Sequence, residues 1–219
     1  MLLSGGLDSA VTLYMARAGG YECYGITFDY GQRHKIEIGS ARKIAAAAGI
    51  KLSVVRLEMP WKGSTLFSGS GKVPVKRSMR RISNGIPSTY VPARNTVFLS
   101  IAVSYAEAIS ADAVFIGAHS EDSSGYPDCR VEYLRAFDYT VGLGTERGIK
   151  GKLRIISPII SMKKKEIVKI GVSLGVPFDR TWSCYNGLKA PCRVCDSCIL
   201  RAKGFKEAGV KDPLLERYG

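Results

Sequence analysis

A short glycine-rich loop is the feature that most constrains how this 219-residue chain can fold. Residues 3–9 read LSGGLDS and stand between an apolar start and a helical pattern over residues 8–18. Gly5 and Gly6 have no Cβ, so their backbone can adopt positive φ and let an anion approach closely. Their N–H groups and the positive end of the following helix form a cradle for phosphate. The loop therefore predicts a nucleotide-binding α/β fold.

The polar side chains of this loop suit the same purpose. Ser4 and Ser9 add hydroxyl donors, and Asp8 stands at a helix N-terminus, where a carboxylate is favourable and can hold Mg²⁺ through water. The loop lacks the G-K-[ST] of a Walker A motif and the G-x-G-x-x-G of a dinucleotide fingerprint. It resembles the S-G-G-x-D-S loop of the PP-loop ATP pyrophosphatases, which grips the leaving pyrophosphate of ATP. The simpler alternative, a capped helix after a glycine turn, leaves the strand before the loop unexplained.

Strand and helix patterns alternate along the chain. The expected strands cover residues 1–3, 21–28, 52–57, 113–116 and 155–156, and the expected helices cover residues 8–18, 35–48, 95–109, 131–139 and 161–174, with one more after residue 198. Gly49 is expected just past a helix end, and Asn95 and Ser161 are expected as N-caps. This alternation predicts a parallel sheet with helices on both faces, which binds ligands at the carboxyl ends of its strands.

Two segments depart from the alternation and set the expected domains. Residues 62–90 are rich in Gly, Ser, Pro and cations and are predicted to form a basic mobile loop over the site. Residues 181–219 carry most of the cysteines and are predicted to form a zinc-binding appendage. The remaining chain, residues 1–180, is expected to be a PP-loop ATP-binding domain of the adenine-nucleotide alpha-hydrolase-like type.

Charge and hydropathy narrow the class of protein further. The chain has 32 basic and 19 acidic residues, a formal net charge of +13, which favours anionic partners without choosing among nucleotides, phosphates and nucleic acid. No run of 18 apolar residues predicts a membrane helix, and the start does not have the pattern of a signal peptide. We expect a cytoplasmic protein that does not bind membranes.

Two polar clusters are expected beside the loop. Residues 29–34 (DYGQRH) follow a strand, where Tyr30 can stack on a base and Arg33 can meet a phosphate. His34 is expected at the surface rather than as a catalytic base. Arg94 precedes a helix and suits an anion clamp, although a solvated arginine is the simpler alternative.

Four of the six cysteines are predicted to bind one metal ion. Cys184, Cys192, Cys195 and Cys198 lie within fifteen residues, which in a chain expected to be cytoplasmic indicates a metal site rather than disulfides. Four thiolates complete a tetrahedral zinc site and leave no position for water, so the zinc is expected to be structural. An iron–sulfur cluster is the alternative. Cys23 is expected to fill a buried space, and the role of Cys129 stays open.

Taken together, the motifs resemble those of the 7-cyano-7-deazaguanine synthase family, and they follow one another in order over nearly the whole chain. The family usually has more strand before the glycine loop than residues 1–3 and a glycine where this chain has Arg193. The resemblance rests on residues 4–9, 30–34, 90–95, 125–130 (GYPDCR) and 182–185 (WSCY) and on the four cysteines.

The resemblance implies a reaction, cofactors and partners. The family converts 7-carboxy-7-deazaguanine and ammonia to the nitrile with ATP and Mg²⁺, through an acyl adenylate and an amide, and releases AMP and pyrophosphate. A homodimer is implied, and no direct contact with nucleic acid is expected. The product serves the queuosine or the archaeosine route.

The site residues follow from the loop and from the resemblance. Asp128 or Asp122 is expected to accept from the guanine-like N–H edge of the substrate. Tyr126 is expected to stack on its ring, with packing beside Pro127 as the alternative. The expected catalytic residues are Ser4, Asp8, Ser9 and Arg94; the ATP-binding residues are Leu3, Ser4, Gly5, Gly6, Leu7, Asp8, Ser9, Tyr30, Gln32 and Arg33; and the substrate-binding residues are Tyr126, Asp128 and Asp122.

Two rival interpretations use the same features. A PP-loop tRNA-modifying enzyme of the sulfuration or lysidine type would use the positive charge for RNA and Cys129 as a sulfur carrier. However, 219 residues leave no room for a separate RNA-binding domain, and no aromatic RNA platform is visible. A zinc-knuckle nucleic-acid-binding protein would explain the charge and the cysteines but not the glycine loop.

Overall fold

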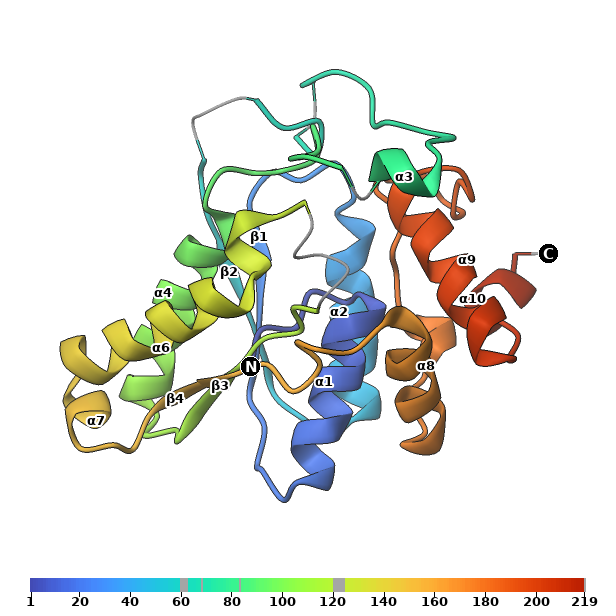
Figure 1. Ribbon diagram of the computed structural model, residues 1–219. Helices are drawn as coiled ribbons and strands as arrows, with labels where there is room; N and C mark the ends of the chain where they lie inside the picture. The colour runs from blue at the N-terminus through green and yellow to red at the C-terminus, as the bar shows by residue number, and fades with distance from the viewer. Residues whose placement is uncertain (60–62, 68, 83, 120–124, 219) are drawn as a thin grey trace.

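The fold is an α/β arrangement of parallel strands between two groups of helices (Figure 1). The computed structural model describes residues 1–59, 63–67, 69–82, 84–119 and 125–218. Strands β1 (Gly25–Asp29) and β2 (Leu52–Arg56) pair in parallel, as do β3 (Ala113–Phe115) and β4 (Arg154–Ile156). The expected parallel α/β fold is confirmed.

The first three residues join the two strand pairs. Leu2 forms a parallel bridge with Ile26 of β1, and its N–H donates to the Phe115 carbonyl of β3 at 2.9 Å. Leu3 N donates to the Ile26 carbonyl at 2.9 Å. The order across the sheet is therefore β2, β1, residues 1–3, β3 and β4, so the glycine loop leaves from the middle of the sheet.

Helices cover both faces, and each face has its own core. On one side, α1 (Leu7–Ala18), α2 (Ile36–Ala47) and α8 (Lys164–Ser173) bury residues such as Leu13, Ile44 and Ile167. On the other side, α4 (Arg94–Ala108) and α6 (Val131–Gly144) bury Leu99 and Leu134 against the strands. Four of the five residues of β1 are buried, as a strand covered on both faces requires. The short elements are α3 (Met79–Ile82), η1 (Pro127–Cys129), α7 (Glu146–Ile149), η2 (Phe178–Arg180) and α10 (Pro213–Glu216).

Several expected boundaries were wrong, and at the two expected N-caps a different residue takes the capping position. The strand expected from residue 21 begins at Gly25, and α6 runs to Gly144 rather than to residue 139. Asn95 is not an N-cap, because α4 begins one residue earlier after Ala93, which has φ of 51°. Ser161 is not an N-cap either, because α8 begins after Lys163, whose N–H donates to Glu166 Oε2 at 2.7 Å. Gly49, with φ of 65°, follows the end of α2 as expected.

A buried ion pair lies within the C-terminal segment, and its arginine also bonds to the chain before that segment. Helix α9 (Asp196–Ala208) carries Arg201, whose guanidinium donates to both carboxylate oxygens of Asp212 at 2.7 and 2.8 Å. The same guanidinium donates to Thr181 Oγ1 at 2.7 Å and to the Phe178 carbonyl at 3.0 Å. Both side chains of the pair are 4% exposed. The boundary near residue 180 remains a prediction, since residues on its two sides share these bonds.

The described part of the basic segment contacts the cysteine-rich region. Val75 bridges Cys195 in an antiparallel pairing, and Lys76 N donates to the Val194 carbonyl at 2.8 Å. Arg77 Nε donates to both oxygens of Asp196, at 3.0 and 3.1 Å. None of the described helices is long and apolar enough to cross a membrane.

Replacing Asp212 by Asn should destabilise the chain strongly. The change leaves the Arg201 guanidinium buried without its counter-charge, which typically costs about 3–5 kcal/mol. Asp112→Asn is a matched control, because Asp112 also pairs with an arginine, Arg147, at 2.7 Å but its side chain is 78% exposed. The control should cost at most about 1 kcal/mol. Urea unfolding measures both, and equal losses would contradict the role given to the buried pair.

Candidate functional site

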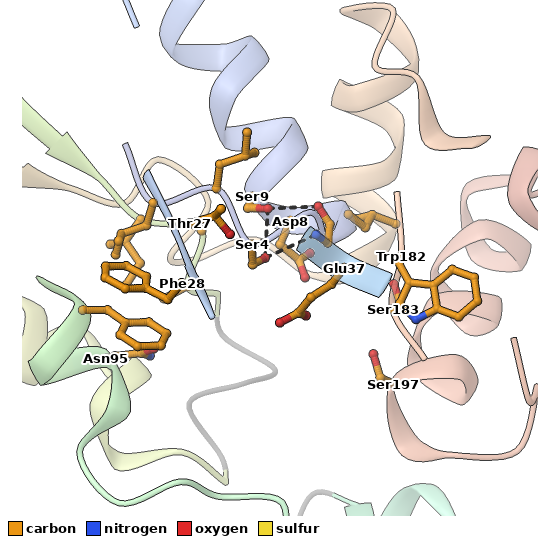
Figure 2. Close-up of a pocket in the computed structure, with 18 of the residues that line it drawn as sticks. Ser4, Asp8, Ser9, Thr27, Phe28, Glu37, Asn95, Trp182, Ser183 and Ser197 are labelled. Atoms are coloured by element: carbon orange, nitrogen blue, oxygen red, sulfur yellow. Dashed lines mark hydrogen bonds between the residues drawn. The ribbon is translucent and has the colours of Figure 1, made fainter. Parts of the chain in front are cut away.

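A single cavity of about 230 Å³ collects most of the residues expected to act. It lies at the carboxyl ends of the strands and is lined by the glycine loop, β1, the first turns of α4 and α8, and the start of the cysteine-rich segment (Figure 2). Its polar lining residues are Ser4, Asp8, Ser9, Thr27, Tyr30, His34, Glu37, Arg94, Asn95, Lys164, Ser183, Tyr185, Ser197 and Arg201.

The glycine loop is seated against α2 and the C-terminal segment. Gly5 has φ of 87°, and a Cβ there would lie 2.2 Å from the Glu37 carbonyl oxygen and 2.7 Å from Ala41 N. No side chain fits this space, so glycine is required both for conformation and for the close approach. The Gly5 carbonyl accepts from Trp182 N at 2.8 Å, which ties the loop to the segment that leads into the cysteines.

The hydroxyl groups of Ser4 and Ser9 lie close to each other in the loop. Ser4 and Ser9 place their Oγ atoms 3.0 Å apart, and Ser4 Oγ accepts from Gly6 N at 3.2 Å (Figure 2). Ser9 Oγ also donates to the Gly6 carbonyl at 3.1 Å. The two hydroxyls and the loop N–H groups thus face one small region at the N-terminus of α1, where an anion is favoured.

Asp8 lies in a compact charged triad at this position. Lys164 Nζ donates to both Asp8 oxygens, at 2.8 and 2.9 Å, and lies 2.7 Å from His119 Nε2. Burial alone would raise the pKa of the Asp8 carboxyl, but Lys164 and His119 outweigh it and hold that pKa well below its usual range. Asp8 is therefore a carboxylate throughout the physiological pH range.

Three of these site residues were not predicted from the sequence. Lys164 and Glu37 lie in helices, and nothing in their local pattern distinguishes them from surface residues. His119 follows the expected strand at residues 113–116, so its place at the carboxyl end of a parallel strand was the one usable signal.

Tyr30 and Arg94, both expected, meet at the cavity. Arg94 Nη1 donates to Tyr30 Oη at 3.1 Å, and its guanidinium lies 5.9 Å from the centre of the Tyr30 ring. Burial raises the pKa of Tyr30 to about 12, so its phenol keeps its proton. The structure thus brings an arginine and a neutral tyrosine to the same wall of the cavity.

Two other expected ATP contacts point elsewhere. Gln32 is fully buried, and its amide accepts from Tyr30 N at 2.8 Å and donates to the Phe28 carbonyl at 2.9 Å. Arg33 Nη2 donates to the Gly71 carbonyl at 2.6 Å. Neither is among the described lining residues, and their contact with ATP remains a prediction.

His34 was expected at the surface, and that expectation was wrong. It is 3% exposed, lines the cavity, and places Nε2 3.1 Å from Glu37 Oε2. Its ring lies 5.8 Å from that of Tyr185, because the segment after Cys184 folds back over it.

Two of the expected substrate contacts, Asp128 and Tyr126, are not among the residues that line the cavity. Asp128 Oδ2 accepts from Asn95 N at 2.9 Å, so this carboxylate caps the first turn of α4 from 33 residues away in sequence. Asn95 Nδ2 donates to the Asp128 carbonyl at 3.2 Å and to Cys129 Sγ at 3.2 Å. Tyr126 Oη lies 2.7 Å from Thr89 Oγ1. Asn95 and Cys129 line the cavity, and Asp122 lies outside the described residues.

The four cysteines converge as the spacing predicts. Their Sγ atoms all lie within 4.8 Å of one another, and Cys192 and Cys198 place theirs 4.0 Å apart. Thiolates around one tetrahedral zinc at about 2.3 Å would lie roughly 3.8 Å apart, so the group fits a single ion better than a multi-iron cluster. Cys192 N donates to Cys184 Sγ and Cys195 N donates to Cys192 Sγ, each at 3.3 Å. Arg193 takes φ of 62° in the turn between these cysteines, a conformation that favours glycine.

Comparison with known proteins assigns the family. Residues 1–209 match the family described as queuosine biosynthesis protein QueC. The chain belongs to this family. The resemblance seen in the motifs is thereby confirmed over nearly the whole chain.

The names of curated relatives of this chain agree with that assignment. Each is named 7-cyano-7-deazaguanine synthase. The relative from Trichodesmium erythraeum is 50% identical over 98% of both chains. The relative from Trichormus variabilis is 51% identical over 98% of this chain and 96% of its own length. The relative from Thermoplasma acidophilum is 47% identical over 100% of this chain and 92% of its own length.

Removal of the metal ion should weaken nucleotide binding as well as stability. The cysteine segment supplies Ser183, Tyr185 and Ser197 to the cavity, and Trp182 N holds the Gly5 carbonyl. We expect about one zinc per chain. A Cys195→Ser protein, or one treated with a chelator, should melt at a lower temperature and bind ATP less tightly. Metal analysis, calorimetry and ATP titration measure the three quantities.

Cys23→Ser serves as the matched control for the metal site. Cys23 is half-buried and lies outside the four-cysteine group, so this protein should keep its zinc, its melting temperature within a few degrees and its ATP affinity. Zinc loss that leaves both stability and ATP affinity unchanged would show that the segment does not depend on the ion.

Proposed function

We propose that this QueC family member converts 7-carboxy-7-deazaguanine and ammonia to 7-cyano-7-deazaguanine with ATP. One observation carries the proposal. The glycine loop, the Asp8–Lys164 pair and the cysteine segment meet at one cavity, in a chain about half identical over its length to proteins named 7-cyano-7-deazaguanine synthase. The chemistry demanded of such a site is charge neutralisation and positioning of two substrates.

The first step activates the substrate carboxylate. A carboxylate oxygen attacks the α-phosphorus of ATP, the bond to the pyrophosphate oxygen breaks, and an acyl adenylate forms. The loop N–H groups of Gly5 and Gly6 and the hydroxyls of Ser4 and Ser9 would receive the pyrophosphate. Lys164 and Arg94 would offset its charge, since both line the same cavity.

Mg²⁺ fits the donor set beside this loop. Asp8 keeps its negative charge, and its side chain is 25% exposed to the cavity despite its bond to Lys164. The ion would be held by Asp8 and by ATP itself, and would supply neutralisation of the phosphate charge.

The far wall of the cavity suits a planar ring. Phe28 and Phe98 stack with ring centres 4.0 Å apart, and both line the cavity together with Asn95 and Cys129. We assign Asp128 an indirect role, because its carboxylate fixes Asn95, whose side chain then faces the substrate region. Tyr126 and Asp122 remain proposed substrate contacts.

The remaining steps add nitrogen and remove oxygen. Ammonia displaces AMP from the acyl adenylate and gives the amide. A second ATP activates the amide oxygen in the same way, and its departure with AMP leaves the nitrile. We propose that the Gly5–Ser9 region serves both activations, since it is the one phosphate cradle among the described residues.

The expected assembly and location follow the same proposal. We propose a cytoplasmic homodimer with a structural zinc ion in each chain and no direct nucleic-acid contact. Exposed apolar side chains support a partner surface on α6 and α7, where Tyr139, Leu143 and Ile149 are each more than 60% exposed.

One incubation tests the proposed reaction. The protein is given ATP, Mg²⁺, ammonium and 7-carboxy-7-deazaguanine, and AMP and the deazaguanine mass are followed. AMP and the nitrile should appear only with this substrate. Asp8→Asn should lower the rate by about a hundredfold or more, because the loop then lacks its fixed charge.

The principal alternative, a PP-loop tRNA-modifying enzyme, predicts that AMP release depends on tRNA. Cys129 lines the cavity and the net charge is +13, which are the features that would suit a PP-loop tRNA-modifying enzyme. AMP release that requires tRNA and ignores the deazaguanine would overturn the proposed function in favour of that enzyme.

A further inference from the structure

Two carboxylates are present among the described residues that line the cavity, and they differ in their partners. Asp8 is held by Lys164 on both oxygens. Glu37, at the start of α2, is bonded instead to Gln32 and His34. Figure 2 shows its side chain extending into the cavity beside Ser4 and Asp8 and across from Ser183 and Ser197. Among the described residues no lysine or arginine forms an ion pair with Glu37, although the charge of Arg94 acts on it across the cavity.

The position of this carboxylate is fixed from behind. Gln32 Nε2 donates to Glu37 Oε1 at 3.1 Å, and His34 Nε2 lies 3.1 Å from Glu37 Oε2. Gln32 is fully buried and is itself fixed by Phe28 and Tyr30, while Glu37 keeps 17% of its side chain exposed. Each carboxylate oxygen therefore has one supporting contact. Such support is typical of groups whose orientation matters to a reaction.

His34 adds a second observation of the same kind. If Nε2 carries the proton that Glu37 accepts, Nδ1 is left as an acceptor. That atom is buried, and it has no hydrogen-bond partner within the ranges that the structure describes. A small donor entering the cavity beside Glu37 would meet a carboxylate that forms no ion pair with a described lysine or arginine.

We propose that Glu37 is a catalytic residue that binds ammonium and accepts its proton, with Gln32 and His34 as positioning residues. This inference rests on the proposed function, which requires ammonia at an electrophilic acyl carbon. Ammonium offers only donors, so a fixed anion with acceptors around it is the chemical match. Partial burial of a carboxylate costs stability, and the contacts of Glu37 with Gln32 and His34 offset part of that cost. A helix N-terminus alone would be served by an exposed glutamate.

The proposed attack of ammonia on the acyl adenylate conserves atoms and charge. Ammonium gives one proton to the Glu37 carboxylate, and the freed nitrogen lone pair attacks the acyl carbon of the adenylate. The bond from that carbon to the AMP oxygen breaks, and AMP leaves as an anion. The nitrogen then loses a second proton, to solvent or phosphate, and the neutral amide remains. No oxidant or further reactant is needed.

Glu37→Gln tests this assignment by separating activation from nitrogen transfer. Activation is measured without ammonium, as exchange of labelled pyrophosphate into ATP in the presence of 7-carboxy-7-deazaguanine. Nitrogen transfer is measured with ammonium and, separately, with hydroxylamine, which is neutral at pH 7.5 and needs no deprotonation before attack. The variant should keep exchange within about threefold but use ammonium at least tenfold less efficiently, since general-base groups contribute about 10²–10⁴-fold. Hydroxamate formation should stay within about threefold.

Controls keep the outcomes distinct. Glu207→Gln removes an exposed carboxylate on α9, 43% exposed beside Lys203, and should change none of the three rates. Glu37→Asp, which keeps a carboxylate, should recover part of the ammonium use and provides the test if the Gln variant does not fold.

Each remaining result decides one claim. Wild-type protein without substrate-dependent exchange would overturn the proposed function, whatever Glu37 does. Normal ammonium use by both Glu37 variants would overturn the inference alone. Loss of hydroxylamine and ammonium use together, with exchange intact, would also overturn it, because Glu37 would then position the adenylate and not the nucleophile.

Discussion

The close packing of the glycine loop against α2 is the constraint on which the rest of the site depends. Gly5 leaves no room for a Cβ against Glu37 and Ala41, and its carbonyl accepts from Trp182. The loop is thereby fixed by the centre of the sheet, by α2 and by the cysteine segment at once. A metal ion bound by the cysteine group would therefore act on the glycine loop through one backbone bond and a shared cavity wall.

Charge is then distributed unevenly around that loop. One side holds Asp8 with Lys164 and His119, a group suited to the phosphates and their metal ion. Glu37 lies beside this group and is held by Gln32 and His34, and we propose that it binds ammonium. On the proposed account, the phosphates of ATP and the ammonium ion would contact different groups of one cavity.

The sequence predicted those features that have local signals. The glycine loop, the strand–helix alternation and the four cysteines are short-range patterns, and the structure confirms the fold and the cysteine group. Features set by distant contacts were missed. Lys164 reaches Asp8 from 156 residues away, and Asp128 caps α4 in place of the expected Asn95. Ser161 was expected to cap α8, but the N-cap is Lys163, whose N–H donates to the Glu166 side chain three residues later. His34 looked like a surface residue because the segment that covers it, near Tyr185, is remote in sequence.

The central claim is that a substrate carboxylate attacks the α-phosphorus of ATP held on the loop. Substrate labelled with oxygen-18 in its carboxylate tests this directly, with the mass of the released AMP as the measurement. The account predicts that AMP carries one labelled oxygen, because the carboxylate oxygen stays on phosphorus when ammonia displaces it. Unlabelled AMP, or ADP and phosphate as the products, would contradict it.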